Sequence, residues 1–342
     1  MPTPETAPAS PPQAQLMQMA MGFCASYLLR AAVQLSLADH LANGPLTADQ
    51  LAALTHAHAP SLYRLLRALA SIGLFAEDEA HRFSLNALAE PLRADAPGSV
   101  HNSILSVTGP LFTIPWSRLD YCALTGKPSF DANFGVPFFE YLRTQPEEAG
   151  WFSDLLIGLN DADAPAAATA YDFSSFSHIA DIGGATGHML ATILAAHPGP
   201  RGTIFDLPHN HAAATELIAA RGLTDRIDFL PGSFFESIPE ACDLYLLSHV
   251  LHDWSEPECL IILTNCHLAM PPGSRLLILE MVLPEGNTFH PGKMLDITML
   301  ATTRGQERTE AEYRTLLHKA NFQLTRVIPT QSAISIIEAV PV

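Results

Sequence analysis

The stretch HIADIGGATGHML, residues 178–190, constrains the fold more than any other part of the chain. Its apolar residues Ile179, Ala180 and Ile182 are typical of the end of a buried strand. The glycines that follow permit a tight turn, and the pattern then predicts a helix beginning near His188. A strand, a glycine turn and a helix N-terminus in this order predict an α/β unit that binds its ligand at the turn.

The glycine spacing narrows the class of ligand. A dinucleotide fingerprint, GxGxxG, is not met when the count starts at Gly183 or at Gly184. A P-loop is excluded because no Gly-Lys-Ser or Gly-Lys-Thr follows. What remains is Asp181 followed by Gly183 and Gly187. A carboxylate at the strand end repels phosphate but attracts an ammonium group, directly or through water, so the motif favours S-adenosylmethionine.

The composition excludes several other classes of protein. Hydrophobic residues make up 48% of the 342 residues and charged residues 15%, which is typical of a globular chain with room for two domains. The net charge of -17 argues against a nucleic-acid partner. The five cysteines form no CxxC pair, so neither a disulfide framework nor a zinc site is indicated. We expect a cytoplasmic protein.

The N-terminal segment predicts a leader followed by an apolar helix. Residues 1–15 are rich in proline and lack the features of a signal peptide, so we expect a disordered leader. The apolar stretch from Leu16 to Leu37 is interrupted by Gln18 and Arg30, which makes it too polar for a membrane span and typical of a buried helix. Its apolar surface exceeds what one small helical domain needs, so we expect a homodimer.

Residues 16–105 predict a winged-helix-like dimerisation domain. Thr47 is typical of a helix N-cap, and leucines at helical spacing from Leu62 to Leu69 precede Gly73, which predicts the end of that helix. A strand pair is expected at LFAED and HRFSL. Winged helices often bind DNA, and a DNA-binding regulator is the alternative of another class. The acidic residues of the hairpin disfavour it.

Residues 106–165 are rich in aromatic residues and predict a helical connector. The same side chains can line an apolar pocket for a flat organic substrate, and one segment can serve both purposes. We expect Trp116, Phe152 and Asn160 to contact such a substrate.

Residues 166–342 alternate between strands and helices, which predicts an open, mostly parallel sheet. Strands are expected at HIADIG, GTIFDLP, IDFLPG, ACDLYLLS and RLLILEMVLP, with a final pair at FQLTRVIPT and AISIIEAV. Ligands bind at the carboxyl ends of such strands. The polar or aromatic residues expected there are Asp181, Asp206, Ser233, Phe234, His252, Asp253 and Glu280.

Six motifs in this order resemble one known enzyme family. They are DIGGATG, FDLP, GSFF, LHDW, LEMVLP and MLATTRGQERTEAEYRTLL. Together they are similar to the S-adenosylmethionine-dependent O-methyltransferases of the plant caffeate type and their bacterial relatives in aromatic natural-product pathways. The likeness covers almost the whole chain. It implies an enzyme of secondary metabolism with a class I methyltransferase sheet and a helical, dimer-forming N-terminal domain.

The resemblance implies a set of cofactor-binding residues. Asp206 would accept hydrogen bonds from the ribose hydroxyls, unless it only caps the helix before Pro208. Ser233 replaces the aspartate common at the adenine site, and Ser248 replaces the lysine of plant members. The full set is Asp181, Gly183, Gly184, Gly187, Asp206, Ser233, Phe234 and Ser248.

His252 is the expected catalytic base. A phenol with a pKa of about 10 must lose its proton to attack a sulfonium methyl group, and a histidine can accept that proton with a gain of roughly 10²- to 10⁴-fold. The resemblance implies that Glu280 and Glu307 flank the imidazole. Their alternatives are a strand-end salt bridge and a pair with Arg308. No metal site is expected, because His249 and His252 have no evident further ligands.

The sequence indicates fewer residues of the acceptor site than of the cofactor site. Asp296 and Met299 match a helix that lines the acceptor pocket in the family, and the run TTRGQERT is one residue shorter than the family's glycine-rich run. A non-methylating relative, with pericyclic, hydroxylating or decarboxylating activity, is the alternative function. Methylation of nitrogen or of a carboxylate also remains open.

Overall fold

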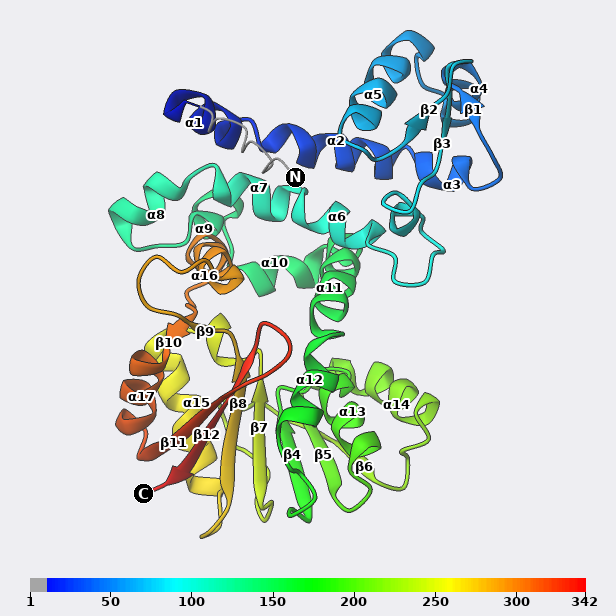
Figure 1. Ribbon diagram of the computed structural model, residues 1–342. Helices are drawn as coiled ribbons and strands as arrows, with labels where there is room; N and C mark the ends of the chain where they lie inside the picture. The colour runs from blue at the N-terminus through cyan, green and yellow to red at the C-terminus, as the bar shows by residue number, and fades with distance from the viewer. Residues whose placement is uncertain (1–10) are drawn as a thin grey trace, which may run out of the picture. The chain divides into compact units, whose positions relative to one another are not determined.

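A computed structural model describes residues 11–342, apart from the side chains of Leu159 and Asn160 (Figure 1). The chain divides into two compact units. The first contains Met1–Thr113 and Pro146–Leu155, and the second contains Ile114–Gln145 and Leu156–Val342. The predicted connector, residues 106–165, is therefore divided between the two units.

The first unit is mainly helical. A three-stranded antiparallel sheet in the order β1-β3-β2 accompanies its helices. Its strands are β1 Leu46–Thr47, β2 Ala76–Glu77 and β3 Arg82–Ser84. Its helices are α1 Pro12–Ala20, α2 Phe23–Gln34, α3 Leu37–Leu41, α4 Ala48–Thr55, α5 Ala59–Ser71, η1 Glu90–Leu92 and α6 His101–Val107, with α7 Pro110–Trp116 and α11 Pro146–Asn160 at the unit boundaries.

The local signals in this unit act as expected. The Thr47 hydroxyl accepts from the Gln50 amide while the Gln50 side chain accepts from the Thr47 amide, a capping box that begins α4. Leu62, Leu66 and Leu69 of α5 are buried in the core of the unit. The hairpin β2–β3 follows, where the strand pair was predicted.

The expectation of a buried N-terminal helix is wrong for the single chain. Leu16, Met19 and Phe23 are 66%, 75% and 56% exposed. The segment Pro12–Gln34 is also long and apolar enough to span a membrane by length and composition alone. The helix α1 begins at Pro12, within the range expected for the leader, and residues 1–10 of that leader lie outside the described residues.

The second unit is built on a seven-stranded sheet in the order β11-β12-β8-β7-β4-β5-β6. The strands from β8 to β6 are parallel to one another, and β12 and β11 add an antiparallel edge. All seven strands were predicted. They are β4 His178–Ile182, β5 Arg201–Asp206, β6 Ile227–Pro231, β7 Leu244–Ser248, β8 Arg275–Glu280, β11 Phe322–Pro329 and β12 Ser335–Pro341.

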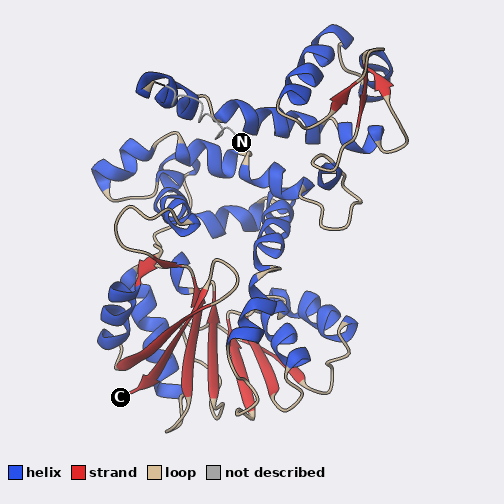
Figure 2. Cartoon of the chain, in the orientation of Figure 1, coloured by secondary structure: helices blue, strands red, loops and turns tan. Residues whose placement is uncertain are grey.

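Helices cover both faces of this sheet (Figure 2). The period-two alternation of a strand decides which helices each residue meets. Ile179 packs into one core with α12, α13 and α14, whereas Ala180 packs into the other core with α15 and α17. These helices are α12 Asp163–Ala170, α13 His188–Ala196, α14 His211–Ala220, α15 Glu256–Ala269 and α17 Glu310–Lys319. The structure confirms the predicted α/β fold.

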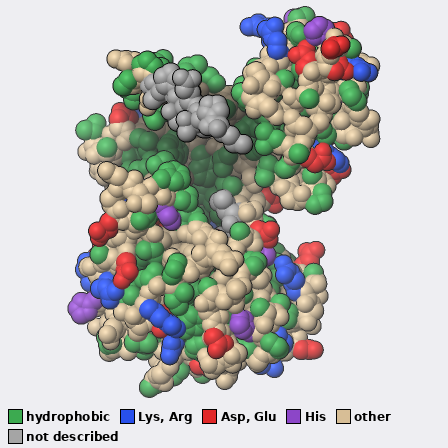
Figure 3. Space-filling model, in the orientation of Figure 1, with side chains coloured by type: hydrophobic (Ala, Val, Ile, Leu, Met, Phe, Trp, Pro, Cys, Tyr) green, Lys and Arg blue, Asp and Glu red, His purple; other side chains and the backbone are tan. Residues whose placement is uncertain are grey.

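Shorter elements complete the unit and place the site. They are α8 Leu119–Thr125, α9 Ser129–Phe134, α10 Phe138–Thr144, η2 Pro208–Asn210, η3 Leu251–Asp253, α16 Pro291–Thr302 and the parallel pair β9 Val282–Leu283 and β10 Arg308–Thr309. On the face drawn in Figure 3, acidic, basic and histidine side chains are mixed around the sheet domain. No single basic patch gathers on that face among the residues drawn in colour.

Candidate active site

The glycine turn joins β4 to α13 at the carboxyl edge of the sheet. Gly183 and Gly187 have φ angles of 74° and 78°, which favour glycine. A Cβ on Gly187 would overlap Ile204 Cδ1, and one on Gly184 would lie 2.6 Å from Asp181 Oδ2. The glycines therefore let the turn pack closely against β5 and against Asp181. The sequence pattern did not show that this packing requires glycine.

Asp181 lies beneath this turn and is fully buried. Neither carboxylate oxygen accepts a hydrogen bond of ordinary geometry from the described residues, although the Leu190 amide faces the group. Burial, and secondarily the charge of Asp206, raises the pKa of Asp181 to about 7. An orphaned buried carboxylate below the turn fits a cationic ligand that neutralises it, and contact would require a bridging water or a shift of the turn.

Asp206 closes β5 beside the turn, where it was predicted. Its Oδ2 accepts from the Ala185 amide at 2.7 Å, and its Oδ1 accepts from the Leu207 amide at 2.6 Å and from Asn210 Nδ2 at 2.9 Å. A carboxylate has about four acceptor positions, so three are already used. Asp206 thus binds its own loop and retains one acceptor position for a ligand. The alternative interpretation, a helix cap before Pro208, is not observed, because neither η2 nor α14 has a side-chain cap.

The predicted adenine-site residues also lie near the turn. The Phe234 ring lies 3.3 Å from where a Cβ on Gly183 would stand. Asn265 holds the Phe234 carbonyl at 2.9 Å, and Trp254 packs edge-on against the Phe234 ring. Ser233 is half-buried, and its hydroxyl accepts from the Phe235 amide at 3.3 Å.

The residues of the turn together fit the predicted cofactor. Ser248, at the end of β7, is half-buried and stands one strand away from the turn on the same edge. The glycine cradle, the orphaned Asp181 and the strand-end Asp206 supply a close backbone approach and negative charge, both suited to a cation with hydroxyl groups.

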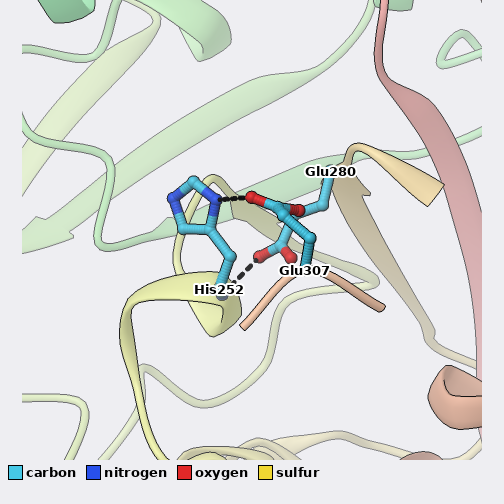
Figure 4. Close-up of side chains that lie close together, drawn as sticks. All are labelled: His252, Glu280 and Glu307. Atoms are coloured by element: carbon cyan, nitrogen blue, oxygen red, sulfur yellow. Dashed lines mark hydrogen bonds and ion pairs between the residues drawn. The ribbon is translucent and has the colours of Figure 1, made fainter. Parts of the chain in front are cut away.

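His252 lies on the other half of the same edge, in the short helix η3 after β7 (Figure 4). Its Nδ1 is 2.6 Å from Glu307 Oε1, and Glu307 is itself almost completely buried. The His252 side chain is 11% exposed. This hydrogen bond directs Nδ1 toward Glu307 and leaves Nε2 for other partners, which is the orientation that a positioned base requires.

Glu280 fixes the backbone that carries the histidine. Its Oε1 accepts from the Leu251 amide at 2.7 Å and from the His252 amide at 3.2 Å. Its Oε2 accepts from the Tyr313 hydroxyl. Glu280 therefore lies beside His252, as the resemblance implied, with an oxygen within 4.8 Å of a ring nitrogen, and its hydrogen bonds go to the η3 backbone and Tyr313.

Carboxylates control the charge of His252. Burial opposes the charged imidazole, but Asp253, Glu307 and Glu280 outweigh it and raise the pKa of His252 to about 10. Asp253 Oδ1 is 3.7 Å from His252 Nε2, and burial raises the pKa of Asp253 to about 6. Burial also raises the pKa of Glu307, against the effect of His252. The site therefore favours a proton on His252.

The same three residues have ligand types that can bind a metal. Oxygen and nitrogen atoms of His252, Glu280 and Glu307 lie within 4.8 Å of one another. However, His252 Nδ1 already bonds Glu307, and both oxygens of Glu280 accept from the Leu251 amide and the Tyr313 hydroxyl. The cluster has the geometry of a hydrogen-bonded network.

Several residues around His252 were missed by sequence reasoning. A Cβ on Gly305 would overlap the His252 carbonyl oxygen, so the run TTRGQERT lies directly on the catalytic turn. His249 has a positive φ of 52°, and its Nε2 lies 3.1 Å from the buried Asp163. The His249 and His252 rings are 5.6 Å apart. No sequence pattern could have indicated the positive φ of His249. Gly305 is evident in the sequence, but sequence analysis assigned no role to it.

The predicted substrate residues are divided between the units. Phe152 belongs to the first unit, and Trp116, Asp296 and Met299 belong to the second. Asp296 Oδ1 accepts from the Glu307 amide at 2.9 Å, so it supports the loop that carries Glu307. Met299 is buried. The Asn160 side chain lies outside the described residues.

A cavity of about 240 Å³ adjoins the catalytic turn within the second unit. Asp253 and Trp254 line it from the turn, and Phe138, Phe139 and Arg304 line it from α10 and the loop after α16. The predicted substrate residues are not among its lining residues.

Family models match both units. The model of the O-methyltransferase domain matches residues 116–323, and the model of the O-methyltransferase dimerisation domain matches residues 17–95.

Individual relatives agree with this match. The chain is 40% identical to phenazine O-methyltransferase PhzM of Lysobacter antibioticus over 98% of each protein. The crystal structure of LaPhzM has a TM-score of 0.91 at 39% identity and covers 97% of this chain and 100% of that one. A neocarzinostatin O-methyltransferase, NcsB1, solved with S-adenosylmethionine and 2-hydroxy-5-methyl naphthoic acid, has a TM-score of 0.82 at 32% identity, with 93% and 96% covered.

The predicted family, fold and cofactor are confirmed by these comparisons. With both halves matched and nearly the whole length aligned, the chain belongs to the S-adenosylmethionine-dependent O-methyltransferases.

Proposed function

We propose that this enzyme transfers a methyl group to a hydroxyl of a small aromatic molecule, with His252 as the general base. The observation that carries the proposal is the buried His252–Glu307 hydrogen bond of 2.6 Å at the carboxyl edge of the sheet, on the same edge as the glycine turn. When bound, S-adenosylmethionine supplies the electrophilic methyl group. The aromatic acceptor is proposed from the relatives, which include enzymes named for phenazine and naphthoate acceptors.

His252 has the basicity that this chemistry requires. Its pKa of about 10 is close to that of an ordinary phenol, so proton transfer from a phenolic hydroxyl to the neutral imidazole is nearly balanced. Because the imidazole is mostly protonated near pH 7, only its neutral fraction acts as the base, and the rate should rise as the pH approaches 10. Glu307 holds Nδ1, which leaves Nε2 to accept the proton, and Asp253 at 3.7 Å from Nε2 stabilises the imidazolium that forms. The base works without a metal ion in this proposal.

The other predicted residues act on the two ligands. Asp206 accepts from one ribose hydroxyl with its remaining acceptor position, and a second would require the loss of one of its three bonds to the loop. Phe234 and Ser233 contact the adenine, and Gly183, Gly184, Gly187 and Ser248 shape the cofactor site. Asp181 compensates the ammonium group from beneath the turn. We further propose that Trp116, Phe152, Asn160, Asp296 and Met299 contact the acceptor.

The first unit supports a homodimer. The small sheet with α4 and α5 has the elements of a winged helix, and we propose that it serves dimerisation. The exposed apolar residues of α1 and α2 would be covered by a second copy of the chain.

We propose a cytoplasmic enzyme that acts on neither nucleic acid nor membrane, consistent with the net charge of -17.

The test is an acceptor screen with the cofactor labelled in its methyl group, using wild type and His252→Gln. A set of hydroxylated phenazines, naphthoates and benzoates should include at least one acceptor that wild type methylates at oxygen and the variant methylates at least about 100-fold more slowly. An acceptor converted equally well by both variants contradicts the role of His252. Conversion without methyl incorporation supports the non-methylating alternative instead.

A further inference from the structure

Arg308 is a buried cation behind the catalytic turn that has no assigned role. It is 2% exposed, and it follows Glu307 directly in the chain. The described residues place no carboxylate within ion-pair distance of its guanidinium, although Glu256 and Asp296 lie on neighbouring elements. The sequence-based alternative that Glu307 pairs with Arg308 is therefore wrong: Glu307 pairs with His252.

The guanidinium instead joins two backbone segments. Its Nη1 donates to the Leu251 carbonyl at 3.2 Å and to the Gln306 carbonyl at 3.1 Å. Leu251 immediately precedes His252, and Gln306 immediately precedes Glu307. Arg308 Nη1 thus binds the residue before His252 and the residue before Glu307, the two residues joined by the 2.6 Å hydrogen bond.

The same side chain contacts the elements that hold Glu280. Its Nη2 lies 3.6 Å from Cys259 Sγ of α15, and its guanidinium lies 5.9 Å from the centre of the Tyr313 ring. The Tyr313 hydroxyl donates to Glu280, which in turn accepts from the Leu251 and His252 amides. Arg308 therefore contacts Leu251 and Tyr313, which both also bind Glu280.

Burying an unpaired guanidinium costs free energy, so its presence needs a compensating charge. Burial opposes the charged form of Arg308, whereas Cys259, Tyr313 and Glu280 favour it, and Glu280 is the carboxylate of the catalytic cluster among them. The ionisable groups that face Arg308 are Glu280, Cys259, Tyr313, Asp296 and Glu256, and those that face His252 are Asp253, Glu307, Glu280 and His249. Without the guanidinium, this cluster would carry more uncompensated negative charge.

We propose that Arg308 is a positioning residue for methyl transfer: it clamps the His252 and Glu307 segments together, and its fixed charge limits how strongly the carboxylates hold a proton on His252. The inference rests on the proposed role of His252 as the base. It extends that role by assigning to Arg308 two separate effects, one on the positions of His252 and Glu307 and one on the proton affinity of His252. Arg308 acts through its neighbours, since its contacts are the Leu251 and Gln306 carbonyls, Cys259 and Tyr313.

Two substitutions separate the clamp from the charge. Arg308→Lys keeps the charge but loses the planar fork that reaches two carbonyls. It should lower kcat about 10-fold and leave the pKa of His252 and the KM for the acceptor unchanged. Arg308→Met removes both features and should raise the pKa of His252, so that kcat at pH 7.5 falls about 100-fold and partly recovers as the pH rises.

The imidazole pKa is measured directly by NMR titration, with the His252 signal assigned from its absence in His252→Gln. This readout needs no turnover, so it tests Arg308 even if every acceptor fails, and such a failure would count against the proposed function alone. An unchanged His252 pKa in Arg308→Met would overturn the proposal.

Arg226 offers a matched control. Its guanidinium also binds backbone carbonyls, those of Leu194, His197 and Pro200, but at the opposite edge of the sheet, where β5 and β6 begin. Arg226→Met should lower the melting temperature without shifting the His252 titration or the pH dependence of kcat. If it shifts both as much as Arg308→Met does, the effects are general consequences of lost stability and the proposal is wrong.

Discussion

The two halves of the sheet's carboxyl edge are built in opposite ways. At the cofactor half, β4 ends in the glycine turn and β5 ends in Asp206, whose carboxylate accepts from the backbone amides of Ala185 and Leu207. At the proton-transfer half, the network is made mostly by side chains: His252 after β7 binds Glu307, and Glu280 at the end of β8 binds Tyr313 and the backbone amide of His252.

The carboxylates that end β5 and β8 also differ in burial, although Asp181 of β4 is fully buried beneath the turn. Asp206 is half-exposed and retains one acceptor position for a ligand. Glu280 and Glu307 are buried, and the charges there interact strongly because water is excluded. The comparison teaches that the first half is arranged to bind a ligand and the second to set the proton affinity of one imidazole. Substitutions in the two halves should therefore affect different measured quantities.

The largest effect is expected from His252→Ala. Loss of the general base should lower kcat by roughly 10²- to 10⁴-fold. Binding of S-adenosylhomocysteine, measured by calorimetry, should remain within about twofold of wild type, because the cofactor half makes no use of the imidazole. A large loss of binding would show that the two halves are not separable.

Asp206→Asn should produce the reverse pattern. A hydrogen bond to a charged group contributes about 1.5–3 kcal/mol, so cofactor affinity should fall about 10- to 100-fold. At saturating cofactor, kcat should change little. Because Asp206 also binds Leu207 and Asn210, a thermal unfolding scan serves as the control, and a melting temperature far below that of wild type would assign the loss to the loop instead.

A pair of glycine substitutions sharpens the comparison. Gly187→Ala would overlap Ile204 at a φ of 78°, and Gly305→Ala would overlap the His252 carbonyl. Each should lower the free energy of unfolding by about 1–3 kcal/mol. At a temperature where both variants are folded, calorimetry should detect weaker cofactor binding only in the first, and steady-state kinetics should detect lower kcat only in the second. Equal effects on both quantities would contradict the separation.

The last prediction concerns the pH dependence of stability. The pKa of His252 is raised to about 10 from an unfolded value of about 6.5, so the stability that it contributes is fully present below pH 6.5 and is lost as pH rises through about 10. Urea unfolding of wild type should therefore show a stronger decline in free energy between pH 7 and 10 than that of Glu307→Gln, which weakens the cause of the shift. Parallel declines would show that His252 is not charged in the folded enzyme.

Local patterns predicted the cofactor half well. The glycine spacing placed the turn and the start of α13 at His188, and the strand-end position of Asp206 placed it beside that turn. These contacts join residues that belong to one β-α-β unit, so short-range signals suffice. The same signals could not show that Asp206 already binds Asn210, because loop conformation depends on packing.

The proton-transfer half was less predictable. The resemblance brought Glu280 and Glu307 to His252, but the spacing of the three residues along the chain contains no such information. Tyr313, Arg308 and Asp163 were missed, since each acts through a contact with a distant segment. The excess apolar surface of α1 and α2 was expected, but the apolar pattern did not show which of its residues are exposed in the single chain.

The amino-acid sequence by itself determined the order of strands and helices, the glycine turn and the acidic strand ends, because periodicity, capping and backbone freedom act within a few residues. The tertiary structure decided which carboxylate orients His252, which holds its backbone, and how the buried charges around it balance. Those outcomes depend on distances between β7, β8, α17 and the loop after α16, and electrostatic interactions in a buried site change steeply with such distances.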